Sequence, residues 1–144
     1  MAKSMNEWAA EIHENAIAHG WWDDPQRSFG EIIALCHSEL SEALEEYRNK
    51  RPMLYYPCNT GSVCCEERGD KGVSCGSRVW NPETPEIYCK AKSDKPEGAA
   101  VEMIDCMIRI LDWCGFMGVD VDAILEAKHE YNKTRPYRHG GKAL

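Results

Sequence analysis

The chain has 144 residues, of which 43% are hydrophobic and 28% charged, and its formal net charge is -7. This composition predicts one globular domain over residues 1–144 and excludes a wholly disordered chain. The acidic balance, 24 Asp and Glu against 17 Lys and Arg, argues against general nucleic-acid binding, because phosphate backbones require a basic surface. The stretch from Met1 to Gly20 contains three glutamates and no continuous apolar run. We therefore expect no secretory signal, no membrane span and a cytoplasmic protein with reduced thiols.

Apolar residues at helical spacing predict four helices. The second begins at Ser28, whose hydroxyl and the carboxylate of Glu31 form a capping pair, and Pro52 prevents its extension. Gly115 is expected to end the third helix, and Pro136 the fourth. The predicted helices run from about Ser4 to His19, from Ser28 to about Asn49, from near Pro96 to Trp113 or Cys114, and from after Asp120 to Arg135.

A long insert, at about residues 51–95, separates the second helix from the third. It is rich in proline and glycine, shows no apolar period and holds five of the eight cysteines. Three interpretations of these thiols are open: they bind a structural Zn²⁺, they stay reduced in an adaptive loop, or they form disulfides. The candidate zinc ligands are Cys58, Cys64, Cys75 and Cys89. The remaining thiols, Cys36, Cys106 and Cys114, lie among apolar helical neighbours and are expected in the core.

Without the insert, roughly a hundred residues remain to bury the apolar faces of four helices. The third helix is apolar on nearly every side, which predicts a central position. The expected fold is therefore an all-α helical bundle of about four helices, completed by homo-oligomerisation into a homodimer or tetramer.

Acidic side chains extend the apolar stripes of two predicted helices. Glu39 and Glu42 share one sector of the second helix, and Glu102 and Asp105 share one sector of the third, which continues to Arg109 and Asp112. Burying like charges without a cation is unfavourable, and hard oxygen ligands suit Mg²⁺ or Mn²⁺. The alternatives are a solvated acidic face on the second helix and, on the third, an ion pair with Arg109.

The segments Glu39-Leu-Ser-Glu42 and Glu102-Met-Ile-Asp105, followed by Lys128-x-x-x-Asn132-x-x-Arg135, resemble the MazG-like group of all-α nucleoside triphosphate pyrophosphatases. The resemblance covers most of the chain outside the insert, although the insert itself departs from the simplest pattern of that group. It implies a Mg²⁺-dependent enzyme that cleaves an NTP or dNTP between its α and β phosphates. It also implies that Glu39, Glu42, Glu102 and Asp105 bind the metal and serve catalysis, and that Lys128, Asn132 and Arg135 contact the substrate.

Two further residues are candidate substrate contacts. The ring of Trp22 is suited to stack on a nucleobase, and the alternative is that it packs against the helix ends. Arg138, in the basic C-terminal tail, is suited to bind phosphate, and the alternative is a tail without a ligand. The competing functional class is a noncatalytic helical interaction module whose Cys-rich insert binds metal or a protein partner.

Overall fold

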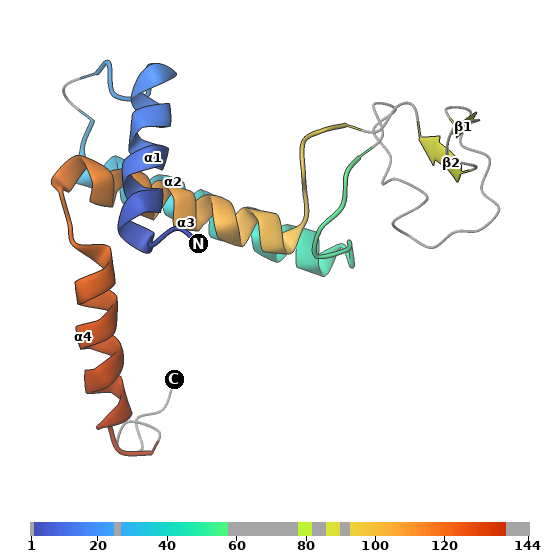
Figure 1. Ribbon diagram of the computed structural model, residues 1–144. Coiled ribbons are helices and arrows are strands. Elements are labelled where there is room, and N and C mark those ends of the chain that lie inside the picture. The colour runs from blue at the N-terminus through green and yellow to red at the C-terminus, as the bar shows by residue number, and fades with distance from the viewer. Residues whose placement is uncertain (1, 25–26, 58–77, 82–85, 90–92, 138–144) are drawn as a thin grey trace. The chain divides into compact units, whose positions relative to one another are not determined.

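The computed structural model describes residues 2–24, 27–57, 78–81, 86–89 and 93–137. In this part of the chain the four predicted helices are confirmed, and an antiparallel hairpin within the insert adds to them. None of the described helices is both long and apolar enough to span a membrane. The elements are α1 (Met5–Ala18), α2 (Phe29–Arg48), β1 (Arg78–Asn81), β2 (Glu86–Cys89), α3 (Ala99–Met117) and α4 (Val121–Lys133) (Figure 1).

Capping side chains define where the helices begin. Ser28 and Glu31 exchange the expected pair of hydrogen bonds before α2, both of 3.2 Å. The carboxylate of Asp120 accepts a hydrogen bond from the backbone N–H of Ala123 at the start of α4. Ser4 begins α1 with a complete capping box. Each cap satisfies backbone donors that have no partner within the helix.

The prediction that α3 ends before Gly115 is wrong, since the helix continues to Met117. A Cβ atom at Gly115 would lie 2.5 Å from the carbonyl oxygen of Ala9 and 2.7 Å from the Cβ of His13. This glycine therefore allows α1 to approach α3 closely. The helix ends instead before Gly118, whose φ of 62° is left-handed.

Two other predicted helix limits differ from the structure by two or three residues. Helix α3 begins at Ala99, not near Pro96, because Gly98 has a left-handed φ of 118°. Helix α4 ends at Lys133, not at Arg135. Its last turn closes with the hydroxyl of Thr134 donating to the carbonyl of Tyr131.

The chain divides into two compact units, Met1–Ile32 with Ile108–Leu144, and Ile33–Met107. In the first unit, α1 packs against the C-terminal half of α3 around the buried residues Ala9, Leu111 and Cys114. The side-chain amide of Asn6 donates to Asp120 (2.8 Å), and its carbonyl accepts from the backbone N–H of Val121 (2.7 Å). These bonds join the N-terminal ends of α1 and α4.

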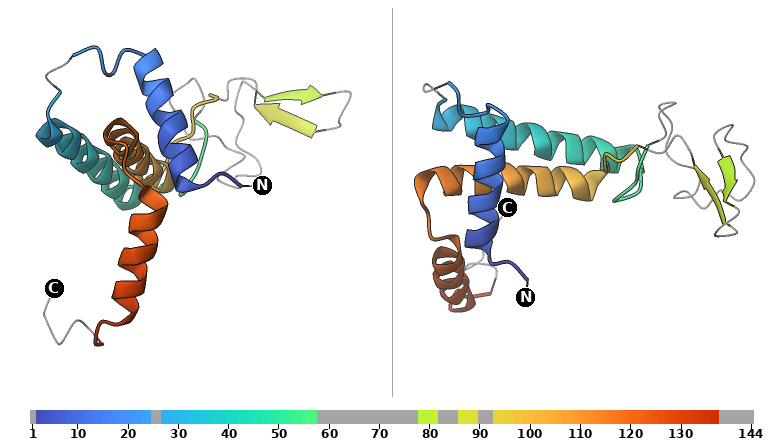
Figure 2. Two further views of the ribbon diagram at one scale, coloured as in Figure 1. Left: turned by 60° about the vertical axis from the view of Figure 1, so that its left-hand side comes forward. Right: turned by 45° about the horizontal axis from the view of Figure 1, so that its top comes forward.

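In the second unit, residues 33–48 of α2 and residues 99–107 of α3 run side by side in opposite directions (Figure 2). Small residues make this approach possible: Cys36 and Ala43 are buried on α2, and Ala99 and Cys106 on α3. The two cysteines are thus core residues, as predicted. This close pairing positions the acidic residues that both helices carry.

Candidate functional site

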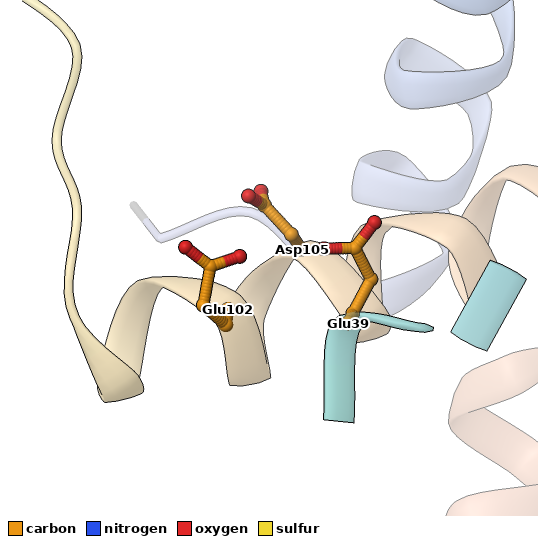
Figure 3. Close-up of side chains that lie close together, drawn as sticks. All are labelled: Glu39, Glu102 and Asp105. Atoms are coloured by element: carbon orange, nitrogen blue, oxygen red, sulfur yellow. The ribbon is translucent and has the colours of Figure 1, made fainter. Parts of the chain in front are cut away.

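Three of the four predicted metal-binding carboxylates come together between α2 and α3. One carboxylate oxygen from each of Glu39, Glu102 and Asp105 lies within 4.8 Å of the other two. The three side chains point to the same side of the helix pair (Figure 3). Residues more than sixty positions apart in the sequence thus meet at one point, as the stripe pattern predicts.

Helical geometry explains why these positions converge. Glu39 follows Cys36 by three residues and precedes Ala43 by four, so it belongs to the buried stripe of α2 and is only 6% exposed. Glu102 and Asp105, separated by three residues, share one face of α3 and are half-buried. The solvated-face alternative therefore does not describe Glu39.

The surroundings of Glu102 in this cluster disfavour its charged form. Burial raises the pKa of Glu102, and the nearby charges of Asp105, Glu42 and Glu39 raise it further. A group whose charged form is disfavoured by its neighbours gains from a cation placed among them. Three carboxylate oxygens at this spacing fit the ligand preference of Mg²⁺ or Mn²⁺.

Glu42 lies beside this group but outside it. Its side chain is exposed, and its carboxylate accepts a hydrogen bond of 3.1 Å from the hydroxyl of Ser38, one turn earlier on α2. Its negative charge still contributes to the raised pKa of Glu102. The structure thus places the fourth predicted ligand next to the other three.

The predicted phosphate contacts lie on α4 and just after it, in the first unit. Lys128, Asn132 and Arg135 are all exposed, and the ammonium of Lys128 lies 5.0 Å from the ring centroid of Tyr131. Arg138, the other predicted contact, lies outside the described residues.

Trp22 belongs to a polar network that the sequence does not predict. Its indole N–H donates to both oxygens of Asp112, at 2.9 and 3.1 Å. Nδ1 of His13 lies 2.8 Å from the same carboxylate, and the guanidinium of Arg27 lies 3.7 Å away. The Trp22 ring also stacks on Phe116, with centroids 4.2 Å apart.

The charged stripe of α3 indicates Asp112 itself but none of its partners. Asp112 continues the line of Glu102 and Asp105, yet it is 8% exposed and receives its partners from the segment between α1 and α2 and from α1 itself. Beside the network is a cavity of about 330 Å³, a volume typical of small-molecule pockets. It is lined by His13, Ile17, Trp22, Asp24, Arg27 and Phe116.

The zinc prediction is not tested by the described residues. Cys58, Cys64 and Cys75 lie outside them, and only the backbone of Cys89 is described, at the end of β2. Comparisons of the chain with protein-family models, curated proteins and solved structures find no match. The resemblance to the MazG-like group therefore rests on the residue pattern.

Proposed function

We propose that this protein is a Mg²⁺-dependent nucleotide pyrophosphohydrolase that cleaves an NTP or dNTP between the α and β phosphates. The observation that supports the proposal most directly is the convergence of Glu39, Glu102 and Asp105 within 4.8 Å. A buried carboxylate paired with two half-buried ones provides a ligand set for a hard divalent cation. Mn²⁺ would suit the same oxygens.

Each proposed residue has a distinct task. Glu39, Glu102 and Asp105 would hold the metal, and Glu42 would complete the set or accept the proton of the attacking water. When bound, the metal supplies charge neutralisation of the phosphates and a more acidic water ligand. Lys128 and Arg135 stabilise the negative charge of the leaving pyrophosphate, and Asn132 donates hydrogen bonds to the substrate.

Trp22 remains a proposed contact for the base. It lines the 330 Å³ cavity, and the aromatic side chain of Phe116 lines it too. The indole N–H is occupied by Asp112, the ring is stacked on Phe116, and the Arg27 guanidinium lies 4.9 Å from its centroid, so a base would have to displace one of these ring contacts in order to stack on Trp22.

The test is a panel of ribonucleoside and deoxyribonucleoside triphosphates incubated with protein and Mg²⁺, with products separated by chromatography. We expect equal amounts of monophosphate and pyrophosphate. Reaction in ¹⁸O-labelled water then shows which of these two products receives the oxygen of water, and hence which phosphorus is attacked. Diphosphate and inorganic phosphate as products would contradict the proposed cleavage position.

Variants link the activity to the carboxylate cluster. Glu39→Gln keeps the size of the side chain but removes its charge, and we expect turnover to fall about a hundredfold or more. Glu45→Gln is the matched control, since this glutamate lies on the same helix but is exposed and outside the cluster. No turnover of any nucleotide by the parent protein would instead favour the noncatalytic interaction module.

A further inference from the structure

One carboxylate organises the polar network beside the 330 Å³ cavity of the first unit. Nδ1 of His13 and the indole N–H of Trp22 both lie within hydrogen-bond distance of Oδ1 of Asp112, at 2.8 and 2.9 Å. The indole nitrogen is also 3.1 Å from Oδ2, and the guanidinium of Arg27 is 3.7 Å from that oxygen. Asp112 is only 8% exposed, so these side chains and not bulk water surround its carboxylate.

The hydrogen bond to Asp112 determines which nitrogen of the His13 ring carries a proton. A neutral imidazole has one N–H group and one acceptor nitrogen. A carboxylate has no proton to donate, so Nδ1 carries the proton and donates it to Asp112, and Nε2 is the acceptor. Among the described residues, the structure gives Nε2 no hydrogen-bond partner.

The His13 ring belongs to the wall of the cavity and is held in place there. Its side chain is 16% exposed and lines the cavity together with Trp22 and Phe116. Both of these rings meet the imidazole edge-on, with centroids 5.1 and 5.9 Å from its own. Aromatic packing and the bond to Asp112 therefore fix the orientation of the imidazole, and with it the position of Nε2.

Polar contacts matter in this cavity because the Trp22 ring already has partners. It stacks on Phe116, with centroids 4.2 Å apart, and the Arg27 guanidinium lies 4.9 Å from its centroid. A flat ligand therefore cannot rely on a free face of the indole. An acceptor in a half-buried wall favours a ligand that brings an N–H group, because an acceptor that is buried without a partner costs free energy. The chemistry fits a planar nitrogen heterocycle with an N–H or amino group.

We propose that Asp112 is a positioning residue of this cavity, which fixes the tautomer of His13 so that Nε2 accepts a hydrogen bond from the N–H or amino group of a bound nucleobase. Asp112 is not among the described residues that line the cavity, so it acts through His13. The inference rests on the proposed function for the identity of the ligand, whereas the tautomer follows from the hydrogen bond alone.

Asparagine at position 112 should reverse the tautomer. In Asp112→Asn the amide oxygen still accepts from Trp22, whereas the amide N–H group donates to Nδ1 and the ring proton moves to Nε2. Long-range ¹H–¹⁵N spectra of the histidine side chains, recorded at about pH 8.5 where imidazole is ordinarily neutral, distinguish the two tautomers. His13→Ala identifies the His13 signals by their absence. Glu14→Gln, the same chemical change at an exposed position of α1, is the matched control and should keep the tautomer of the parent.

Titration with the four common nucleosides, followed in the same spectra, tests the ligand. We expect at least one of them to shift the Nε2 signal of His13. Asp112→Asn should weaken the binding of that nucleoside about tenfold, because two N–H groups then face each other. The control ligand is its analogue in which methyl groups replace the hydrogens on the base nitrogens, and it should leave the Nε2 signal unchanged. An Nε2–H tautomer in the parent, or an Nε2 signal that no nucleoside shifts, overturns the inference.

Kinetics separate positioning from a general structural effect. With the nucleotide that the parent hydrolyses best, we expect Asp112→Asn to raise KM about tenfold and to change kcat by less than about twofold, because the carboxylate cluster belongs to the other unit. His13→Ala should raise KM as well, and adding Asp112→Asn to it should have little further effect. Additive effects of the two substitutions would show that Asp112 does not act through His13. The tautomer of the parent and the KM of His13→Ala keep the test decisive if Asp112→Asn does not fold.

The inference and the proposed function fail in different ways. A protein that binds a nucleoside through Nε2 of His13 but hydrolyses no nucleotide overturns only the proposed reaction. Nucleotide hydrolysis by a parent protein whose Nε2 carries the proton overturns only the role of Asp112.

Discussion

At the scale of single residues, Asp112 has three side-chain partners among the described residues of the first unit. His13, Trp22 and Arg27 all direct donors toward its carboxylate. Removing this carboxylate takes away the hydrogen-bond partner of the Trp22 indole and the His13 ring and the counter-charge of Arg27. Substituting Asp112 should therefore lower the free energy of unfolding more than an ordinary surface substitution does.

We expect Asp112→Ala to lower the free energy of unfolding by about 3 kcal/mol, and Asp112→Asn to lower it less, because the amide keeps one acceptor. Urea denaturation followed by circular dichroism measures both values. Glu14→Ala, at an exposed position of α1, serves as the control and should change the value by less than about 0.5 kcal/mol. An effect of Asp112→Ala as small as the control's would show that the network adds no stability.

The raised pKa of Glu102 predicts how the stability of the metal-free protein depends on pH. Its pKa is raised above the ordinary glutamate value of 4.5, first by burial and then by the neighbouring carboxylates. The folded state thus binds this proton more tightly than the unfolded state, and stability should fall as the pH rises from 4.5 through the higher pKa of the folded protein. Mg²⁺ should reverse that loss at neutral pH.

The corresponding variant is Glu102→Gln. We expect its melting temperature without Mg²⁺ at neutral pH to equal or exceed that of the parent, and Mg²⁺ to raise it less than it raises the parent's. Asp105→Asn should behave in the same way, and Glu45→Gln should respond to Mg²⁺ as the parent does. A lower melting temperature of Glu102→Gln without metal would indicate a structural ion pair instead.

The residue pattern predicts the carboxylate cluster because helical periodicity alone places Glu39 on one face of α2, and Glu102 and Asp105 on one face of α3. It does not predict the network around Asp112, because His13 and Trp22 lie 99 and 90 positions away and no local rule brings them there.

At the scale of elements, helix starts are predicted better than helix ends. The Ser28–Glu31 pair and Asp120 are local signals, and both act as expected. Gly115 is a local signal that is misleading, because a tertiary contact with α1 accounts for it. A glycine within a predicted helix thus indicates either the end of that helix or the close packing of another segment against it, and the sequence alone does not distinguish these two cases.

Two glycines allow this interpretation to be tested. Gly115→Ala should lower the free energy of unfolding by about 1–3 kcal/mol, because overpacking against Ala9 and His13 outweighs the higher helix propensity of alanine. Gly30→Ala is the matched control: at that position in α2, the nearest atom to a new Cβ is the Ser28 hydroxyl, at 3.8 Å. It should raise stability by up to about 1 kcal/mol. Equal effects of the two substitutions would refute close packing at Gly115.

At the scale of the whole molecule, apolar side chains remain exposed on the helices of both units. In the second unit they line an open groove of about 380 Å³ between α2 and the start of α3. Apolar patches of this kind on a folded protein commonly mark association surfaces. The groove is lined by Leu40, Ala43, Leu44, Tyr47, Met53, Ala99, Ala100 and Met103.

We therefore expect the protein, with a chain mass of 16.4 kDa, to be at least a dimer at micromolar concentration in light scattering. Leu44→Glu should dissociate it, because the charge would be buried in the interface without a partner. In an isolated chain the same substitution should be nearly neutral, since Leu44 is 47% exposed. Tyr137→Glu, at an exposed residue outside the groove, is the control and should leave the mass unchanged. If the parent protein is monomeric, fully helical and active, then the exposed apolar groove does not mediate association with a second copy of the chain.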